Sequence, residues 1–183
     1  MTAPALELMT IPEFLAWSER HEEARYELAD GEIVAMPREQ PEQVTAKGKI
    51  WRAVAEALAR AGAPCEAYVG GLGVAVDQHT VYAPDILVNC GDPITTEEML
   101  APAPIVIVEL LWPTSDTKDA NVKREDYFRV ASLAHYLVVD PARRAVLHYR
   151  RDAAATFRPE TVTEGSIRLD PPGIDLALRD IFA

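Results

Sequence analysis

The most constraining feature of this sequence is a glutamate inside an apolar run that has the length of a β-strand. Residues 105–111 read Ile-Val-Ile-Val-Glu-Leu-Leu, and their β-branched content predicts a strand buried on both faces. Glu109 is the single charged residue of this run. An isolated carboxylate removed from water costs many kcal/mol unless it is protonated, paired or bound to a cation. We therefore expect Glu109 to have a partner that the strand itself does not supply.

The segment after this strand predicts a helix over residues 116–130 that packs back over the sheet. Asp119, Lys123 and Tyr127 are spaced by four residues and hence lie on one helical face. An exposed ion pair between Asp119 and Lys123, worth about 0.3–0.5 kcal/mol, explains this spacing without any function. With Glu109 nearby, the amine of Lys123 can instead orient or deprotonate a water molecule, or stabilise charge on a phosphoryl group.

A second acid, Asp85, lies in the strand predicted over residues 81–89. This strand and the Glu109 strand are consecutive, so antiparallel pairing of neighbours is the simplest arrangement. With Asn89 opposite Ile105, the register places Asp85 directly across from Glu109 with both side chains on one face. A slip of one residue would send the two acids to opposite faces.

Two carboxylates in such a pair repel each other unless one is protonated or a cation lies between them. Oxygen ligands from acidic side chains are those that Mg²⁺ or Mn²⁺ prefers, with water and substrate phosphate completing the shell. We therefore predict that Asp85 and Glu109 bind Mg²⁺ (or Mn²⁺) and that Lys123 completes the site. The scattered histidines show no spacing typical of a zinc site.

Length and composition fit a single domain. The chain has 183 residues, 49% of them hydrophobic, which predicts one globular domain over residues 10–183 after a loose tail at 1–9. No apolar stretch is long enough to span a bilayer, so we expect no membrane partner. The formal net charge of −11 repels polyanions, and phosphate contacts dominate nucleic-acid affinity. A nucleic-acid role therefore requires a local basic surface or bound divalent cations.

Cys65 and Cys90 are far apart in the sequence and lie outside any Cys-x-x-Cys motif. This usage predicts two reduced thiols that pack as small buried hydrophobic side chains, in a protein of the cytoplasm.

The remaining patterns predict an α+β fold, with a mixed, mostly antiparallel sheet flanked by helices and with an N-terminal helix and hairpin. Along the chain we expect a helix from Thr10 through about Ser18 or Arg20, a hairpin over 26–36, a polar connector over 37–43 and a helix over 44–61 that Gly62 ends. We then expect a turn over 70–73, strands over 74–76, 135–139 and 145–150, one or two short strands within 157–169, and a helical turn over 175–182.

Two groups of charges in these elements have plain structural interpretations. Glu27 alternates with Tyr26 and Leu28 in the hairpin, which is typical of a solvated glutamate on a sheet edge. Lys47, Lys49 and Arg52 near the start of the second helix are explained by a solvated charged face, and a phosphate-contacting patch is the weaker alternative.

An ordered set of motifs nevertheless spans nearly the whole chain, over about residues 10–182. The set resembles the putative restriction endonuclease family within the PD-(D/E)XK nuclease superfamily. The resemblance implies a restriction-endonuclease-like core and divalent-metal-dependent hydrolysis of DNA phosphodiester bonds. The motifs are Tyr26-Glu-Leu-Ala-Asp-Gly-Glu, Pro84-Asp85, Val108-Glu109-Leu-Leu-x-Pro-Thr-Ser, Asp119-x3-Lys123-x3-Tyr127 and Tyr136-Leu-Val-Val-Asp-Pro141.

The resemblance also assigns roles to individual residues. Asp85 matches the motif aspartate and Glu109 the motif acid, while Leu111 stands where the superfamily usually has a lysine. In this family the lysine comes from the following helix, which here matches Lys123. Glu27 matches an acidic position of the family's first hairpin, which favours a catalytic role over a solvated edge.

Two departures from the family pattern keep other functions open. Gln43 stands where the family often has a histidine, and Trp112 stands where it tends to have a serine. Together with the net charge, they favour a non-catalytic descendant that serves as a binding or assembly module. A metal-dependent hydrolase of a small phosphoester is a third hypothesis, since it needs no basic groove. A homodimer is left open for each of these functions.

Overall fold

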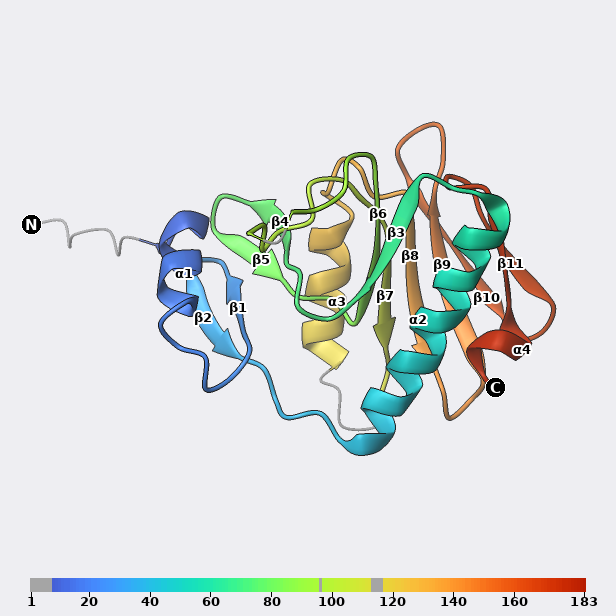
Figure 1. The fold of residues 1–183 in the computed structure, drawn as a ribbon, viewed down its shortest axis with the longest axis horizontal. Helices are drawn as coiled ribbons and strands as arrows, with labels where there is room; N and C mark the ends of the chain where they lie inside the picture. Colours follow the sequence, from blue (N-terminus) through green and yellow to red (C-terminus); the bar gives the residue numbers. More distant parts are fainter. Residues whose placement is uncertain (1–7, 96, 113–116) are drawn as a thin grey trace, which may run out of the picture.

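The computed structural model describes residues 8–95, 97–112 and 117–183, with the side chains of α3 described from residue 120 onward. A main sheet forms the centre of the molecule, and a smaller sheet lies at its N-terminal end (Figure 1). The elements are α1 (Ile11–Ser18), β1 (Tyr26–Ala29), β2 (Glu32–Ala35), α2 (Pro41–Ala61), β3 (Cys65–Val69), β4 (Val74–Asp77), β5 (Thr80–Tyr82), β6 (Ile86–Cys90), β7 (Pro104–Leu110), α3 (Thr117–Tyr127), β8 (His135–Asp140), β9 (Ala145–Arg151), β10 (Phe157–Val162), β11 (Ser166–Leu169), β12 (Ile174–Ala177) and α4 (Leu178–Ile181).

The main sheet has the strand order β10-β9-β8-β7-β6-β3 and is antiparallel except between β7 and β8. The chain between these two parallel strands contains α3, because a parallel connection needs a long crossover. Alternate residues of the sheet face two cores: Ile86 packs in the core that includes α2, and Leu87 in the core that includes Tyr127 of α3. The predicted α+β fold with a mixed, mostly antiparallel sheet flanked by helices is confirmed.

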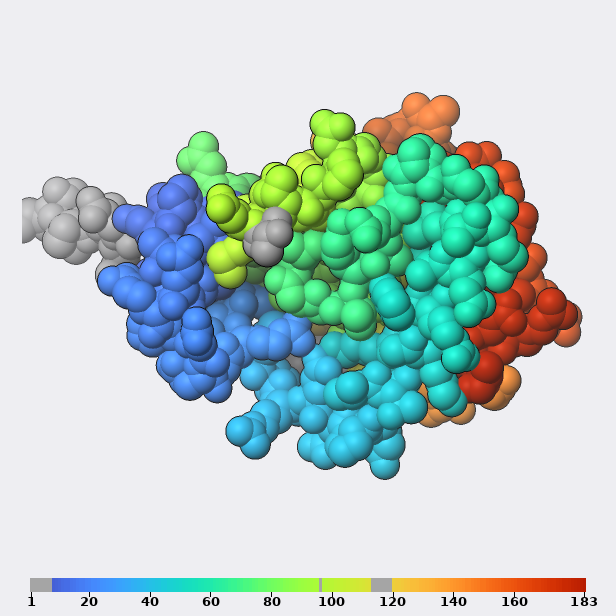
Figure 2. All heavy atoms as spheres, in the orientation of Figure 1, coloured from blue at the N-terminus to red at the C-terminus, as the bar shows by residue number. Residues whose placement is uncertain are grey.

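The smaller sheet has the order β2-β1-β5-β4 and packs against α1. In the space-filling view, the N-terminal segment through β2 forms a lobe at one end of the molecule (Figure 2). The single strand predicted over 81–89 is therefore wrong, because β5 joins the smaller sheet and β6 the main sheet. Pro84 lies between them and has no N–H for a ladder. The short junction between the two sheets carries Asp85.

The predicted register between β6 and β7 is confirmed over three pairs, in which residues 86–88 face residues 106–108 in reverse order. A bulge then places Asn89 opposite Pro104 rather than opposite Ile105, as we had expected. The bulge lies at the far end of the pair, so the predicted alignment holds at the end that carries the two acids.

Helix α2 begins at Pro41, earlier than the predicted Val44. Proline is tolerated in the first helical turn, and the Gln43 side chain accepts a hydrogen bond from the Gln40 N–H at 2.6 Å, which caps the helix. The polar connector is correspondingly shorter. Gly62 ends the helix with a φ of 61°, as its position predicts.

Both ends of the chain differ from the prediction. Of the loose tail expected over 1–9, residues 1–7 lie outside the described residues, whereas the Met9 N–H donates to the Gly31 carbonyl at 3.3 Å. The helical turn expected over 175–182 is reduced to α4, because β12 takes the first part of this segment and pairs with β11.

The prediction that Cys65 and Cys90 are reduced thiols is wrong, because they form a disulfide. The two cysteines are opposite each other in the antiparallel pair of β3 and β6, with their Cα atoms 4.1 Å apart. The sequence could not show this contact, because it depends on the register of two strands that are not adjacent along the chain. The disulfide removes the thiol argument for the cytoplasm, and a cytoplasmic location stays a prediction. Within the described residues, no helix is long and apolar enough to cross a membrane.

Reducing this disulfide should lower the free energy of unfolding by roughly 3 kcal/mol, because the cross-link closes a long loop and restricts the unfolded chain. Urea unfolding with and without a phosphine reductant measures the difference. The matched control is the double variant Cys65→Ser/Cys90→Ser, whose stability should not respond to the reductant. Equal midpoints for the wild type under both conditions would contradict this stabilisation.

Candidate active site

Charged side chains from five different places along the chain gather where the two sheets meet. Three are carboxylates: Glu27 from β1, Asp85 from the junction before β6, and Glu109 near the end of β7. Two are amines: Lys47 from α2 and Lys123 from α3. Of these five, sequence reasoning singled out all but Lys47.

Glu27 is buried, with an exposed fraction of 4%, and does not lie on a solvated edge. Its Oε2 pairs with Lys123 Nζ at 2.5 Å, and its Oε1 accepts a hydrogen bond from the Ala83 N–H at 3.0 Å. The Lys123 amine also lies 5.2 Å from the centre of the Tyr82 ring. The lysine from α3 therefore points towards the acids, in agreement with the helical face expected for it.

Asp85 is held by contacts on both of its oxygens. Oδ2 accepts a hydrogen bond from the Leu110 N–H at 2.8 Å, and Oδ1 pairs with Lys47 Nζ at 2.8 Å. Because Leu110 follows Glu109 directly, the first contact fixes Asp85 against the end of β7, beside the second acid. The carboxylate is thus immobilised at the place where the two sheets join.

Glu109 is partly buried and accepts a hydrogen bond from the Tyr127 hydroxyl at 3.2 Å. Burial, and after it the negative charge on Asp85, raises the pKa of Glu109 to about 8, although the Lys123 amine acts in the opposite direction. The negative charge of Glu27 acts in the same direction as that of Asp85. Glu109 therefore keeps its proton at neutral pH unless a cation binds beside it.

Sequence reasoning missed Lys47, which was assigned to a solvated face with Lys49 and Arg52. The structure instead buries Lys47 to an exposed fraction of 5%. Helical phase was the available signal, because Lys47 lies three residues before Ile50 and seven before Val54, on the apolar stripe of α2. The other two basic residues lie off this stripe.

The donor set fits a divalent cation such as Mg²⁺. Asp85 and Glu109 would hold it, and all their donor atoms are the hard oxygens that this ion selects. The described residues contain no ready cluster of three or more His, Cys, Asp or Glu side chains around one point. Mg²⁺ usually takes one or two protein carboxylates and completes its shell with water and substrate phosphate.

Three positions depart from the sequence pattern described above. Gln43 caps α2, as described above, and Trp112 packs against the core that includes α2. Leu111, where the superfamily usually has a lysine, continues the pairing of the sheet, since its N–H donates to the Val139 carbonyl at 2.8 Å. Residue 116, where we expected the following helix to begin, lies outside the described residues.

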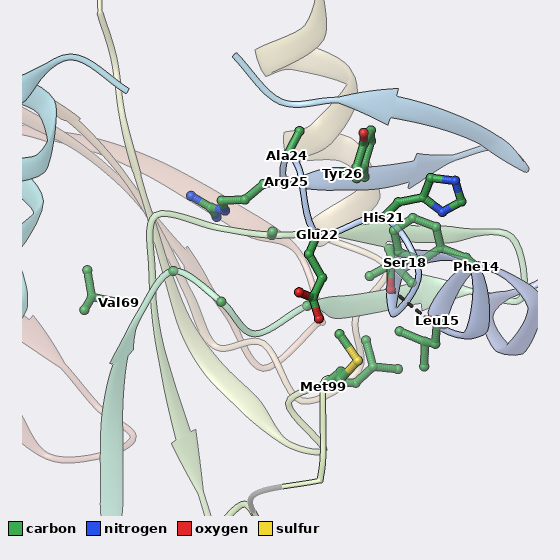
Figure 3. A pocket seen from close by; sticks show the side chains of 16 residues that line it. Phe14, Leu15, Ser18, His21, Glu22, Ala24, Arg25, Tyr26, Val69 and Met99 are labelled. Carbon is green, nitrogen blue, oxygen red and sulfur yellow. Dashed lines mark hydrogen bonds between the residues drawn. The ribbon is translucent and has the colours of Figure 1, made fainter. Parts of the chain in front are cut away.

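A pocket of about 430 Å³ borders the site, between α1 and the turn at Gly70 and Gly71 (Figure 3). Apolar side chains such as Phe14 and Met99 form much of its wall. Arg25 and Ala83 also line the pocket. The Ala83 N–H donates to Glu27, and Arg25 forms an ion pair with Glu39 at 2.7 Å.

Comparisons with known proteins agree with this architecture. The family described as Uma2, putative restriction endonuclease, matches residues 11–179. The chain is also similar to the crystal structure of a putative nuclease belonging to DUF820 from Anabaena variabilis, with a TM-score of 0.73 and 18% sequence identity. The similarity covers 95% of this chain and 97% of that one, which shows a shared fold. A search of curated proteins gives no match.

The raised pKa of Glu109 predicts a specific pH dependence of stability in a metal-chelating buffer. The pKa of this carboxyl is 4.5 in the unfolded chain and about 8 in the folded protein. The unfolded chain therefore loses its proton first, so this group's contribution to stability is present below about 4.5 and is lost as the pH rises towards about 8.

Melting temperatures of the wild type and Glu109→Gln across this pH range test the assignment. The variant has no such proton to lose, so its melting temperature should rise relative to that of the wild type as the pH rises. A difference that stays constant between these two pH values would contradict a raised pKa at Glu109.

Proposed function

The chain belongs to the Uma2 family of putative restriction endonucleases, and from this premise we propose that it is a nuclease that hydrolyses DNA phosphodiester bonds with the help of a divalent metal ion. The observation that carries the proposal is the convergence of Asp85, Glu109 and the Lys123–Glu27 ion pair at the junction of the two sheets. A surface ion pair between α3 and a strand would not need two further carboxylates beside it.

Asp85 and Glu109 would hold Mg²⁺ or Mn²⁺. A bound divalent ion supplies Lewis-acid chemistry, polarising the phosphate and lowering the pKa of a bound water. Glu109 must be ionised to act as a ligand, and a bound cation favours this form, whereas the neighbouring acids oppose it. The Tyr127 hydroxyl and the Leu110 N–H hold the two carboxylates in place, so their geometry is set before a substrate arrives.

Lys123 would act on the water or on the charge that builds on the phosphoryl group. Glu27 holds the amine at 2.5 Å and keeps it directed into the site. Because Glu27 is itself fixed by the Ala83 N–H, the junction between the sheets determines where the amine lies. Glu27 therefore supports Lys123 and need not contact the substrate.

The net charge of −11 bears on the substrate. An acidic protein repels DNA overall, so binding should depend on the bound metal and on a few local cations, and it should weaken as salt is added. The same charge is the observation that favours a small phosphoester as the alternative substrate. A cytoplasmic location and a homodimer stay predictions beside this proposal.

Metal binding is the first expected outcome. Excess Mg²⁺ or Mn²⁺ should raise the melting temperature of the wild type, because a ligand that binds only the folded state stabilises it. Glu109→Gln should remove most of this response by deleting one ionised ligand. An identical response to the metal in both proteins would move the metal site away from Glu109, and no response in either would argue against any metal site.

Cleavage of DNA is the second expected outcome. We would incubate supercoiled plasmid, linear duplex and single-stranded DNA with the protein and Mg²⁺ or Mn²⁺ at low ionic strength. Lys123→Ala should reduce the cleavage rate by roughly 10²–10³-fold, the loss seen when one preorganised donor to a transition-state charge is removed. Circular dichroism should first establish that the variant is folded, since Lys123 is part of a mostly buried ion pair.

Lys49→Ala provides the matched control, because it removes a lysine whose amine contacts the Ala183 carbonyl and not the site acids. Its cleavage rate should equal that of the wild type. Cleavage that survives in Lys123→Ala at the full rate would identify a contaminant or another site. No cleavage of any DNA by a wild type that binds metal would favour the small-phosphoester hydrolase or the non-catalytic module.

A further inference from the structure

Lys47 is a buried lysine whose amine lies between two carboxylates. One is Asp85, at 2.8 Å, and the other is Glu39, which lies in the connector just before α2. Glu39 in turn pairs with Arg25 at 2.7 Å. Charges of alternating sign, Arg25, Glu39, Lys47 and Asp85, thus form a continuous line from the pocket wall to the proposed metal site, and we call this line the ion row.

Burying the amine of Lys47 costs the fold desolvation free energy. A lysine on a helix can normally extend its amine into water, which spares the desolvation of the charge. Lys47 instead lies on the apolar stripe of α2 and directs its amine inward. A buried ion pair is weak evidence for stability, because desolvation offsets most of the attraction between the charges. Its place beside a candidate metal ligand therefore points to a role in that site.

The net charge of the site bears on how many divalent ions it can hold. Among the described residues of the site, the carboxylates of Glu27, Asp85 and Glu109 and the amines of Lys47 and Lys123 sum to one net negative charge when all are ionised. One divalent ion converts this to one positive charge, equal and opposite to that of a phosphodiester. A second divalent ion would leave the site with a large excess of positive charge.

On the basis of the nuclease function proposed above, we propose that Lys47 is a positioning residue that orients Asp85 and takes the place of a second metal ion, so that the site binds a single divalent cation. Its amine on Oδ1 and the Leu110 N–H on Oδ2 fix the plane of the carboxylate. Each carboxylate oxygen can accept more than one contact, so Asp85 could hold a metal ion while it stays paired with Lys47. Partners that orient a metal-binding carboxylate in this way typically change affinity or activity by about 10–100-fold.

Calorimetric titration with Mn²⁺ tests the proposal without relying on activity. The wild type should bind one ion per chain. Lys47→Met should bind two, because Asp85 and Glu39 lose their shared cation and offer a new site. Lys49→Met, the same change two positions along α2, should still bind one. Two ions in the wild type overturn the proposal, and this measurement needs no variant to fold.

Kinetics on DNA separate orientation from a merely structural role. Lys47→Met should lower kcat by about 10–100-fold. Its KM should stay close to that of the wild type, since the lost contact is made to Asp85 and not to substrate. Lys47→Arg keeps the positive charge and should recover part of kcat. A Lys47→Met variant that binds one ion and cleaves at the wild-type rate also overturns the proposal.

These outcomes are distinguishable from a failure of the proposed function. A wild type that binds a single Mn²⁺ and cleaves no DNA, with a second ion gained in Lys47→Met, supports the role of Lys47 and refutes the nuclease. A wild type that cleaves DNA with two bound ions supports the nuclease and refutes the role of Lys47.

Discussion

The ion pair between Lys123 and Glu27 is the contact on which the geometry of this site depends. It joins α3, which packs on the main sheet, to β1, which belongs to the smaller sheet. Pairs that are this well buried add little net stability, because desolvation offsets their attraction, yet removing one partner is costly. The pair therefore acts less as a source of stability than as a constraint, which fixes the smaller sheet relative to the end of β7 where Glu109 lies.

The junction between the sheets turns this constraint into a site. Ala83 and Asp85 flank a proline that has no N–H for a ladder. The Ala83 N–H donates to the Glu27 carboxylate instead of to a neighbouring strand, and the Asp85 carboxylate accepts a hydrogen bond from the Leu110 N–H. One short segment thus contacts the end of β7 and the buried acid of the first hairpin. In a continuous strand the Ala83 N–H would pair with a neighbouring strand and would not reach Glu27.

How far the sequence could predict the site depended on whether a contact follows from local order. The approach of Asp85 to Glu109 could be predicted, because consecutive strands pair and the two acids lie away from the bulge at Asn89. The inward direction of Lys123 could also be predicted, because Lys123 and Tyr127 are four residues apart on α3 and lie on one helical face. The Cys65–Cys90 disulfide could not be predicted, because the hairpin of β4 and β5 separates β3 from β6 along the chain. Lys47 was hidden for a similar reason: its helical phase shows that it faces inward, but only the packing of α2 shows which acid it meets.

The assignment of Lys47 changes how the acidity of the chain bears on function. The net charge of −11 describes the whole surface, whereas the site itself pairs nearly every carboxylate with an amine or a guanidinium. In such a site the amines are largely neutralised until a divalent ion shares the carboxylates. Binding of the ion and of an anionic substrate would then favour each other, since each reduces the charge that opposes the other. An acidic protein can then act on a phosphodiester without a broad basic groove, because only the metal-bound site attracts the anionic substrate.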